Sequence, residues 1–160
     1  MNGEELKEFA KGGKICALTG HRKYSTLLNE AKLKEEFENL IQEGYTLFLC
    51  GMAIGFDTVC CRILFELRKT NAIRIIACIP FTGQEKKFTP RQQEIYRRYV
   101  EECNEKVVLY PSYKAGCFFG RNRYMVDESD VLVAHLYEEK GGTFYTVNYA
   151  KSKNKRIIYV

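Results

Sequence analysis

The 160-residue sequence has no apolar stretch long enough to span a bilayer, no low-complexity tract, and no linker or internal repeat that would divide it. Its first residues, Met1 to Lys14, are polar and lack the apolar centre of a signal peptide. We therefore expect one cytoplasmic domain that has no membrane partner. The length suits a single domain with a sizeable core and is too short for two ordinary ones.

Cysteine pairs with metal-binding spacing are also missing, although the sequence contains seven cysteines. None forms a Cys-x-x-Cys pair, and most lie in apolar runs, so buried thiols in a reducing compartment explain them better than disulfides or a zinc site. No metal site is predicted. Because Cys60 and Cys61 are adjacent, we expect only one of them to face the core and the other to be partly exposed.

The excess of positive charge is small, since 25 lysines and arginines against 20 aspartates and glutamates leave a net charge of +5. These positive residues are scattered along the chain and form no stripe. The balance suits a ligand that carries phosphate better than an extended nucleic-acid surface.

Short apolar runs alternate with amphipathic stretches along the chain, which is typical of strands followed by helices. Strands are expected at 15–19, 45–50, 73–79, 107–110, 131–136 and 156–160, and helices at about 25–43, 55–69, 91–103, 120–128 and 141–151. Near-continuous apolar strands are covered on both faces. The sequence thus predicts an α/β fold with three layers: a Rossmann-like, open, mostly parallel sheet with helices on both faces. This domain would cover residues 14–160, after an N-terminal extension of residues 1–13.

Small, polar and cationic residues follow the expected strands, where open parallel sheets bind their ligands. They are Thr19, Gly20, His21 and Arg22; Gly51, Met52, Ala53, Gly55 and Asp57; Phe81 and Gln84; Arg121 and Asn122; and Gly141, Gly142 and Thr143. We expect these separate stretches to meet in one crevice shaped for an anion.

The loop from Gly51 to Asp57 suits an anion because glycines let the backbone approach a ligand and the following helix begins there. Asp57 would then cap helix amides or accept a hydrogen bond from a sugar hydroxyl. A tight strand–helix turn with a capping aspartate explains the same residues equally well.

Arg22 has the planar guanidinium that suits phosphate or carboxylate, and its position favours this role over a surface ion pair. His21 is better explained as a hydrogen-bonding or exposed residue than as an acid or base. Gly141, Gly142 and Thr143 are the best single candidate for a phosphate-binding turn.

Together these motifs resemble the YpsA-like family of the SLOG superfamily, relatives of the LOG and DprA Rossmann-like domains. They are Thr19-Gly20-His21-Arg22, Gly51 to Asp57, Pro80-Phe81 with Gln84, Arg121 to Asp127 through Asp130, and Gly141-Gly142-Thr143, and they run in family order across nearly the whole chain. The resemblance implies a nucleotide or nucleotide-derived ligand at the strand ends and a self-associating domain. Superfamily members include ligand sensors in bacterial conflict systems, DNA-binding proteins and phosphoribohydrolases.

Two positions depart from the related pattern. LOG-type hydrolases carry a Gly-Gly-x-Gly-Thr loop followed closely by a catalytic glutamate, whereas here Gly142 runs straight into Thr143 and residues 144–147 supply no carboxylate. This argues against N-glycosidic hydrolysis by the LOG mechanism. Cys50 stands where similar proteins often have glycine, which slightly narrows the loop.

The leading hypothesis is a module that senses, carries or sequesters a nucleotide-type ligand, with no further cofactor and with homo-oligomers as its assembly. Arg22 and Arg121 would neutralise phosphate, Asp57 or Gln84 would contact the sugar or base, and Phe81 would stack on the base or serve the core.

Two other functions remain open. One is an enzyme that cleaves an N-glycosidic bond with Asp57, Glu85 or Asp127 as the acid, although Asp127 is better explained as capping its turn. The other is DprA-like binding of single-stranded DNA by an aromatic and basic segment. That segment comprises Tyr110, Tyr113, Lys114, Phe118, Phe119, Arg121, Arg123 and Tyr124.

Overall fold

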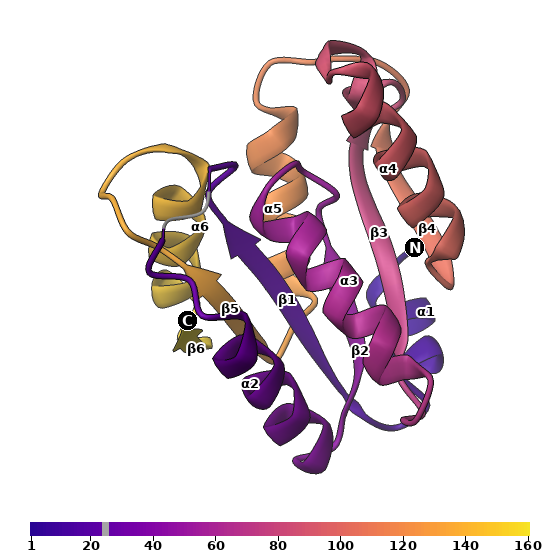
Figure 1. Cartoon of the computed structure of the whole chain (residues 1–160), viewed down its shortest axis with the longest axis vertical. Helices are drawn as coiled ribbons and strands as arrows, with labels where there is room; N and C mark the ends of the chain where they lie inside the picture. The colour runs from indigo at the N-terminus through magenta and orange to yellow at the C-terminus, as the bar shows by residue number, and fades with distance from the viewer. Residues whose placement is uncertain (24–25) are drawn as a thin grey trace.

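The computed structural model describes residues 1–23 and 26–160 and forms one open sheet of six parallel strands (Figure 1). In spatial order the strands are β4 (Glu105–Tyr110), β3 (Arg74–Phe81), β2 (Tyr45–Cys50), β1 (Lys14–Gly20), β5 (Val131–His135) and β6 (Arg156–Tyr159). The prediction of a mostly parallel Rossmann-like sheet is confirmed, and every strand pair is parallel.

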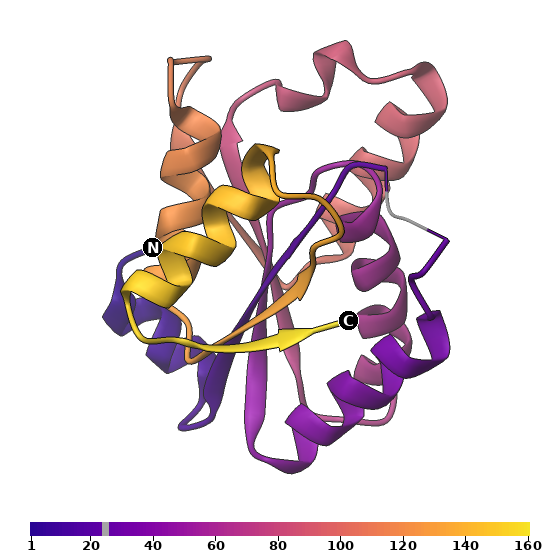
Figure 2. The same ribbon diagram turned by 90° about the vertical axis from the view of Figure 1, so that its left-hand side faces the viewer.

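Helices cover both faces of the sheet, which confirms the expected three layers (Figure 2). One face carries α2 (Glu30–Gln42), α3 (Phe56–Arg68) and α4 (Pro90–Glu102), and the other carries α1 (Gly3–Ala10), α5 (Cys117–Asp127) and α6 (Gly141–Ser152). A short 3-10 helix, η1 (Gln84–Lys87), lies between β3 and α4. No helix in the described residues has the length and apolar character needed to cross a membrane.

The four inner strands, β1, β2, β3 and β5, read as continuous apolar runs because both of their faces are buried. In β2, Phe48 packs into the core under α2 and α3, while Leu47 and Leu49 pack into the core under α1, α5 and α6. Side chains of a strand point alternately to the two faces of its sheet, so a strand covered on both sides has no polar face.

The strand order reverses at β1, and this places the site. From β1 the chain winds outward through β2 and β3 to β4, and it then returns to the other side of β1 with β5 and β6. Gly20 at the end of β1 is paired with His135 at the end of β5. The loops that follow these neighbouring strands diverge to opposite faces, which opens a crevice at the carboxyl edge.

All seven cysteines are free and buried, as the sequence predicted, but one expectation about them is wrong. Both Cys60 and Cys61 are fully buried, because α3 is packed against the sheet and also against α2 and α4. The Cys61 Sγ lies 3.2 Å from the Cys50 Sγ and 3.7 Å from the Met52 Sδ. Burial raises the pKa of the Cys60 thiol well above its usual value, which makes it a poor nucleophile.

The N-terminal extension contains a helix, and α2 is shorter than expected. Leu6 and Ala10 of α1 are buried in the core, so this helix packs on the sheet. Helix α2 begins at Glu30, later than expected, because the Asn29 side chain accepts a hydrogen bond from the Lys32 amide and caps the helix there. Ser25, an expected start of this helix, lies outside the described residues.

Candidate ligand-binding crevice

The loops after β1 and β2 lie against each other so closely that two positions accept only glycine. A Cβ atom on Gly20 would lie 2.3 Å from the Phe56 ring, and one on Gly55 would lie 1.8 Å from the carbonyl oxygen of Arg22. Gly55 also has a φ of +87°, a conformation that side chains with a Cβ rarely adopt. The two loops therefore form one continuous wall beside Arg22.

Arg121 ties α5 to the ends of two strands. It is 5% exposed, and its Nη1 donates hydrogen bonds to the carbonyl oxygens of Gly51 and Cys78, the second at 3.2 Å. Its Nε donates to the Oδ1 of Asn122 at 2.8 Å. Burial lowers the pKa of Arg121 and the nearby Asp57 carboxylate opposes this effect, but a guanidinium stays charged in proteins. The structure thus places a fixed positive charge at the base of the crevice.

A cavity of about 440 Å³ opens between these loops and the starts of α5 and α6; we call it the crevice. Of the predicted ligand-binding residues, it is lined by Thr19, Gly20, His21, Arg22, Gly51, Ala53, Asp57, Arg121, Asn122, Gly142 and Thr143. Phe81 and Gln84 line a neighbouring outer cavity of about 610 Å³, which also includes Arg22 and Ala53. Five separate stretches of the chain therefore meet at one edge of the sheet.

Three predicted residues lie at the margin of this arrangement. Met52 and Gly55 line a smaller, mainly apolar cavity of about 190 Å³ between α3 and α4. Gly141 has a φ of +86° and turns the chain into α6 immediately before Gly142, but it is not among the residues that line the crevice.

The α-helices that begin at or beside the crevice differ at their N-termini from the other three α-helices. No side chain caps the N-termini of α3, α5 and α6, which begin after Gly55, Gly116 and Lys140. By contrast, side chains of Asn2, Asn29 and Thr89 cap α1, α2 and α4. Uncapped helix N-termini direct amide groups and the positive ends of their dipoles at their surroundings, which favours an anion there.

Asp57 is the acidic residue of the crevice lining. Its side chain is 6% exposed, and its Oδ2 accepts a hydrogen bond from the Ala53 amide at 3.0 Å. Burial raises the pKa of Asp57 to about 6, although Arg121, the Ala53 amide and Arg22 act in the opposite direction. The carboxyl group holds the β2–α3 loop through the Ala53 amide, and its raised pKa brings its titration closer to neutral pH than that of an ordinary aspartate.

This carboxyl group predicts a measurable pH dependence of stability. Since its pKa is higher in the folded chain than in the unfolded one, the folded state binds more protons between about pH 4 and 6. Its contribution to stability is thus present at low pH and is lost as the pH rises through about 6. The raised pKa corresponds to a loss of ~3 kcal/mol at most.

Urea unfolding of the wild type and of Asp57→Asn between pH 4.5 and 7.5 checks this expectation. As the pH rises, the unfolding free energy of the wild type should fall relative to that of Asp57→Asn. The asparagine side chain stays neutral at every pH, and its oxygen still accepts the hydrogen bond from the Ala53 amide. Parallel stability curves for the two proteins would contradict the raised pKa.

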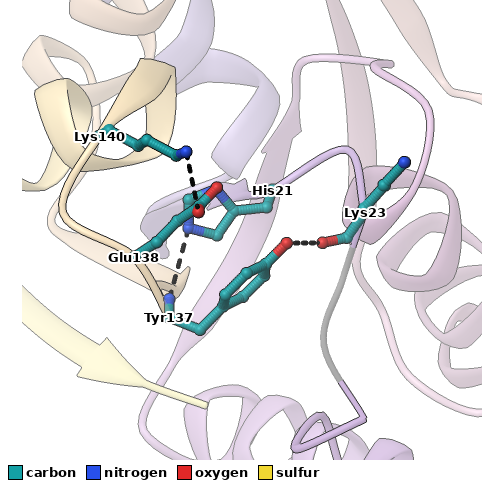
Figure 3. A network of polar contacts seen from close by, with 5 residues as sticks. All are labelled: His21, Lys23, Tyr137, Glu138 and Lys140. Carbon is teal, nitrogen blue, oxygen red and sulfur yellow. Dashed lines mark hydrogen bonds and ion pairs between the residues drawn. The ribbon is translucent and has the colours of Figure 1, made fainter.

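His21 holds the loop between β5 and α6 in place (Figure 3). Its Nε2 accepts a hydrogen bond from the Tyr137 amide at 3.4 Å, and its Nδ1 lies 3.9 Å from the Glu138 carboxylate, which also pairs with Lys140. The Tyr137 hydroxyl donates to the Lys23 carbonyl oxygen. Burial lowers the pKa of His21, partly offset by Glu138. The neutral ring thus links the β1 loop to the loop that leads into Gly142.

Gln84 uses its amide within the protein. Its Nε2 donates to the carbonyl oxygens of Met52, at 3.1 Å, and Gly51, at 3.4 Å. The side chain is buried, so it supports the β2–α3 loop from the direction of the outer cavity.

The other two acidic candidates do not join Asp57. Glu85 lines a separate cavity beside α4 and β4. Asp127 is exposed at the C-terminal end of α5, whereas Gly116 precedes the N-terminal end. There Asp127 accepts a hydrogen bond from the Tyr149 hydroxyl at 2.8 Å. Neither is placed to act on a ligand in the crevice. Among residues 1–23 and 26–160, no three acidic, histidine or cysteine side chains are grouped to hold a metal ion.

Two aromatic residues of the segment considered for DNA binding, Phe118 and Tyr113, lie at the mouth of the crevice. Phe118 lies under both arginines, 5.6 Å from the Arg22 guanidinium and 6.0 Å from that of Arg121. Tyr113 is 65% exposed and, like Phe118, lines both the crevice and the outer cavity. Lys86 and Lys87, which line the outer cavity, belong to none of the sequence motifs. Only their position after β3 could have indicated that they lie near the site.

The aromatic and basic segment does not form one continuous platform. Phe119 packs against Tyr145, with ring centres 4.5 Å apart, and the Tyr124 hydroxyl donates to the Met1 carbonyl oxygen. Tyr113 and Phe118 line the crevice, and Phe119 lines it as well as contacting Tyr145. The segment is therefore divided among a helix–helix contact, the N-terminus and the candidate site.

Sequence comparison identifies the family to which this fold and these loops belong. A family model described as YspA SLOG family (YpsA) matches residues 16–159, nearly the whole chain. The chain belongs to the YpsA SLOG family. This confirms the resemblance carried by the strand-end motifs.

Relatives of this SLOG chain include YoqJ, an SPbeta prophage-derived protein of Bacillus subtilis (strain 168). The two are 32% identical over 138 residues, which is 75% of this chain and 81% of YoqJ. A UPF0398 protein of Bacillus licheniformis is 25% identical over 158 residues, covering 89% of this chain and 86% of that protein.

Solved structures of DNA processing protein A (DprA) have a similar fold. The Streptococcus pneumoniae protein aligns with 95% of this chain at a TM-score of 0.63 and 20% identity, and the Helicobacter pylori protein with 95% at 0.67 and 17%. This chain spans about half (51%) of the former and 67% of the latter. At these identities the similarity concerns the fold alone.

Proposed function

We propose that this protein binds a nucleotide-type ligand with a phosphate group in the crevice. The observation that carries the proposal is the convergence of the uncapped N-termini of α5 and α6 with Arg22 and Arg121 on one cavity. Backbone amides supply donors for phosphate oxygens, while the two guanidinium groups compensate the charge. Membership of the SLOG family agrees with a nucleotide-derived ligand.

The charges of the crevice support an anionic ligand. Among the described residues, neither Arg22 nor Arg121 lies within ion-pair distance of a carboxylate oxygen. Two exposed arginines elsewhere are paired, Arg62 with Glu30 and Arg156 with Glu43. A bound phosphate would add to the compensation that the nearby Asp57 carboxyl group gives these two side chains.

The mouth of the crevice supports a base next to the phosphate. The exposed ring of Tyr113 offers a flat apolar surface on which a nucleobase stacks favourably. The Phe118 ring contacts the guanidinium groups of Arg22 and Arg121, and its centre lies 5.8 Å from the centre of the Phe81 ring. These contacts restrict the movement of the two arginine side chains. A phosphate below Arg22 and a base on Tyr113 would together fill the cavity.

A second function, cleavage of an N-glycosidic bond, is favoured by one observation. Asp57 has a pKa of about 6 inside the crevice, which suits a carboxyl group that donates and accepts a proton near neutral pH. In this alternative Asp57 protonates the leaving base or stabilises the positive charge that develops on the sugar. We rank it below binding because, among the described residues, Asp57 is the only carboxylate that lines the crevice.

Thermal unfolding in the presence of nucleoside 5′-monophosphates tests the proposal. At a hundredfold excess over its dissociation constant, a bound nucleotide should add ~2.7 kcal/mol to the unfolding free energy. Arg22→Ala should weaken binding at least tenfold, because it removes an exposed cation that the fold does not use in an ion pair.

Lys34→Ala is the matched control, since it removes one positive charge from the exposed side of α2 and should leave binding unchanged. The proposal fails if no nucleotide raises the melting temperature, or if both variants lose the same affinity. Chromatography of the same mixtures distinguishes the two functions: intact nucleotide supports binding alone, and free base that disappears in Asp57→Asn supports catalysis.

A further inference from the structure

The crevice continues into the outer cavity rather than ending at Arg22. The two cavities share four lining residues, Arg22, Ala53, Tyr113 and Phe118. With volumes of about 440 and 610 Å³, each alone is in the size range of a small-molecule site. The two cavities adjoin at these four residues, and we call them together the groove, whose combined volume exceeds that of either cavity alone.

The far end of this groove is positively charged. Lys86 and Lys87 line the outer cavity together with Arg22, and none of the described residues that line it is acidic. Among residues 1–23 and 26–160, neither lysine lies within ion-pair distance of a carboxylate oxygen. The groove therefore has unpaired cations at both ends, with Tyr113 and Phe118 between them.

The turn that carries the two lysines is held firmly by the protein. Nε2 of Gln93 donates to the carbonyl oxygens of Glu85, Lys86 and Phe88 at 3.1 to 3.3 Å, which fastens η1 to α4. Gly83 precedes the turn with a φ of +96° and lies under Lys86, where a Cβ would be 2.9 Å from the lysine Cε. The lysine backbone is thus fixed relative to the groove, although the charged ends remain exposed.

We infer that the groove binds a ligand with two phosphate groups on opposite sides of one nucleoside. This inference rests on the proposed function and extends it: one phosphate lies at the helix N-termini, the nucleoside lies over Tyr113, and the second phosphate lies at Lys86 and Lys87. A free nucleoside 3′,5′-bisphosphate has this chemistry, and so does the 5′-phosphorylated end of a short oligonucleotide.

Calorimetric titration at low salt compares the 5′-monophosphate and the 3′,5′-bisphosphate of each of the four common ribonucleosides. The bisphosphate of the preferred nucleoside should bind at least tenfold more tightly than its monophosphate. In the double variant Lys86→Ala/Lys87→Ala this advantage should fall to threefold or less, while monophosphate affinity should stay within twofold of the wild type.

Lys32→Ala/Lys34→Ala removes the same two charges from the exposed surface of α2 and controls for net charge. It should retain the full advantage of the bisphosphate. If the advantage is absent, or survives the loss of Lys86 and Lys87, this inference is wrong while monophosphate binding still supports the proposed function. If neither nucleotide binds, both are wrong.

A 5′-phosphorylated dinucleotide distinguishes the two sources of this chemistry. Binding tighter than the bisphosphate, and dependent on the two lysines, assigns the groove to a strand end. Equal or weaker binding of the dinucleotide assigns it to the free bisphosphate. Either result supports two phosphate positions.

Discussion

Replacing Gly55 with alanine is expected to destabilise the protein by more than ~3 kcal/mol, which is exceptional for a single methyl group. The new Cβ would lie 1.8 Å from the Arg22 carbonyl oxygen, so the β1 and β2 loops would have to separate. The substitution also places a side chain at a φ of +87°. Because these loops form one wall of the crevice, nucleotide affinity should fall as well. Urea unfolding and calorimetry measure the two effects.

Gly12→Ala is a closely matched control. Gly12 has a φ of +84°, but no atom lies within 4 Å of its expected Cβ position. The Gly12→Ala variant should therefore lose only the ~1–2 kcal/mol of unfolding free energy that a side chain costs in the left-handed backbone conformation. The difference between the two variants isolates the close approach of the loops. Similar losses for Gly55→Ala and Gly12→Ala would mean that the loops do not depend on this contact.

Arg121→Met is expected to reduce stability by ~2–4 kcal/mol and to abolish measurable nucleotide binding. Methionine fills much of the space but removes the guanidinium donor from the carbonyl oxygen of Cys78 and leaves that of Gly51 with only the 3.4 Å hydrogen bond from Gln84. It also removes a positive charge that lowers the pKa of Asp57, so that pKa should rise further. Urea unfolding at several pH values measures both consequences.

Arg121→Lys separates the charge from the geometry. An ammonium group keeps the positive charge but lacks the planar set of donors that reaches two carbonyl oxygens and Asn122 together. It should retain part of the stability and part of the affinity. Normal stability together with normal nucleotide binding in Arg121→Met would contradict both the structural and the ligand-binding role of this residue.

The fold was predictable because its signals are local. Buried strands such as 45–50 read as apolar runs, amphipathic helices followed them, and short connections imply parallel strands. The edge of the sheet was predictable for the same reason, since the residues after parallel strands must lie at one end. Self-association stays a prediction from the family resemblance.

The roles of single residues were less predictable, because they depend on contacts between distant segments. Gln84 followed a strand as expected, yet its amide binds the carbonyl oxygens of the β2–α3 loop. Asp127 belongs to the motif from Arg121 to Asp127, but it lies at the C-terminal end of α5, away from the crevice. Cys61 is buried because α2 and α4 pack beside α3. The sequence pattern of residues 56–68 does not indicate these neighbouring helices.

The sequence by itself determined the alternation of strands and helices, the parallel sheet and the set of loops at its carboxyl edge. These follow from hydrophobic periodicity and turn residues, which act over a few neighbouring positions. Only the tertiary structure decided that Arg121 reaches the β2 and β3 carbonyl oxygens, that Asp57 is buried beside it, and that the crevice continues toward Lys86 and Lys87. Burial, pKa and cavity shape arise from packing between segments that are far apart in the chain, so their physical cause exists only once the chain has folded.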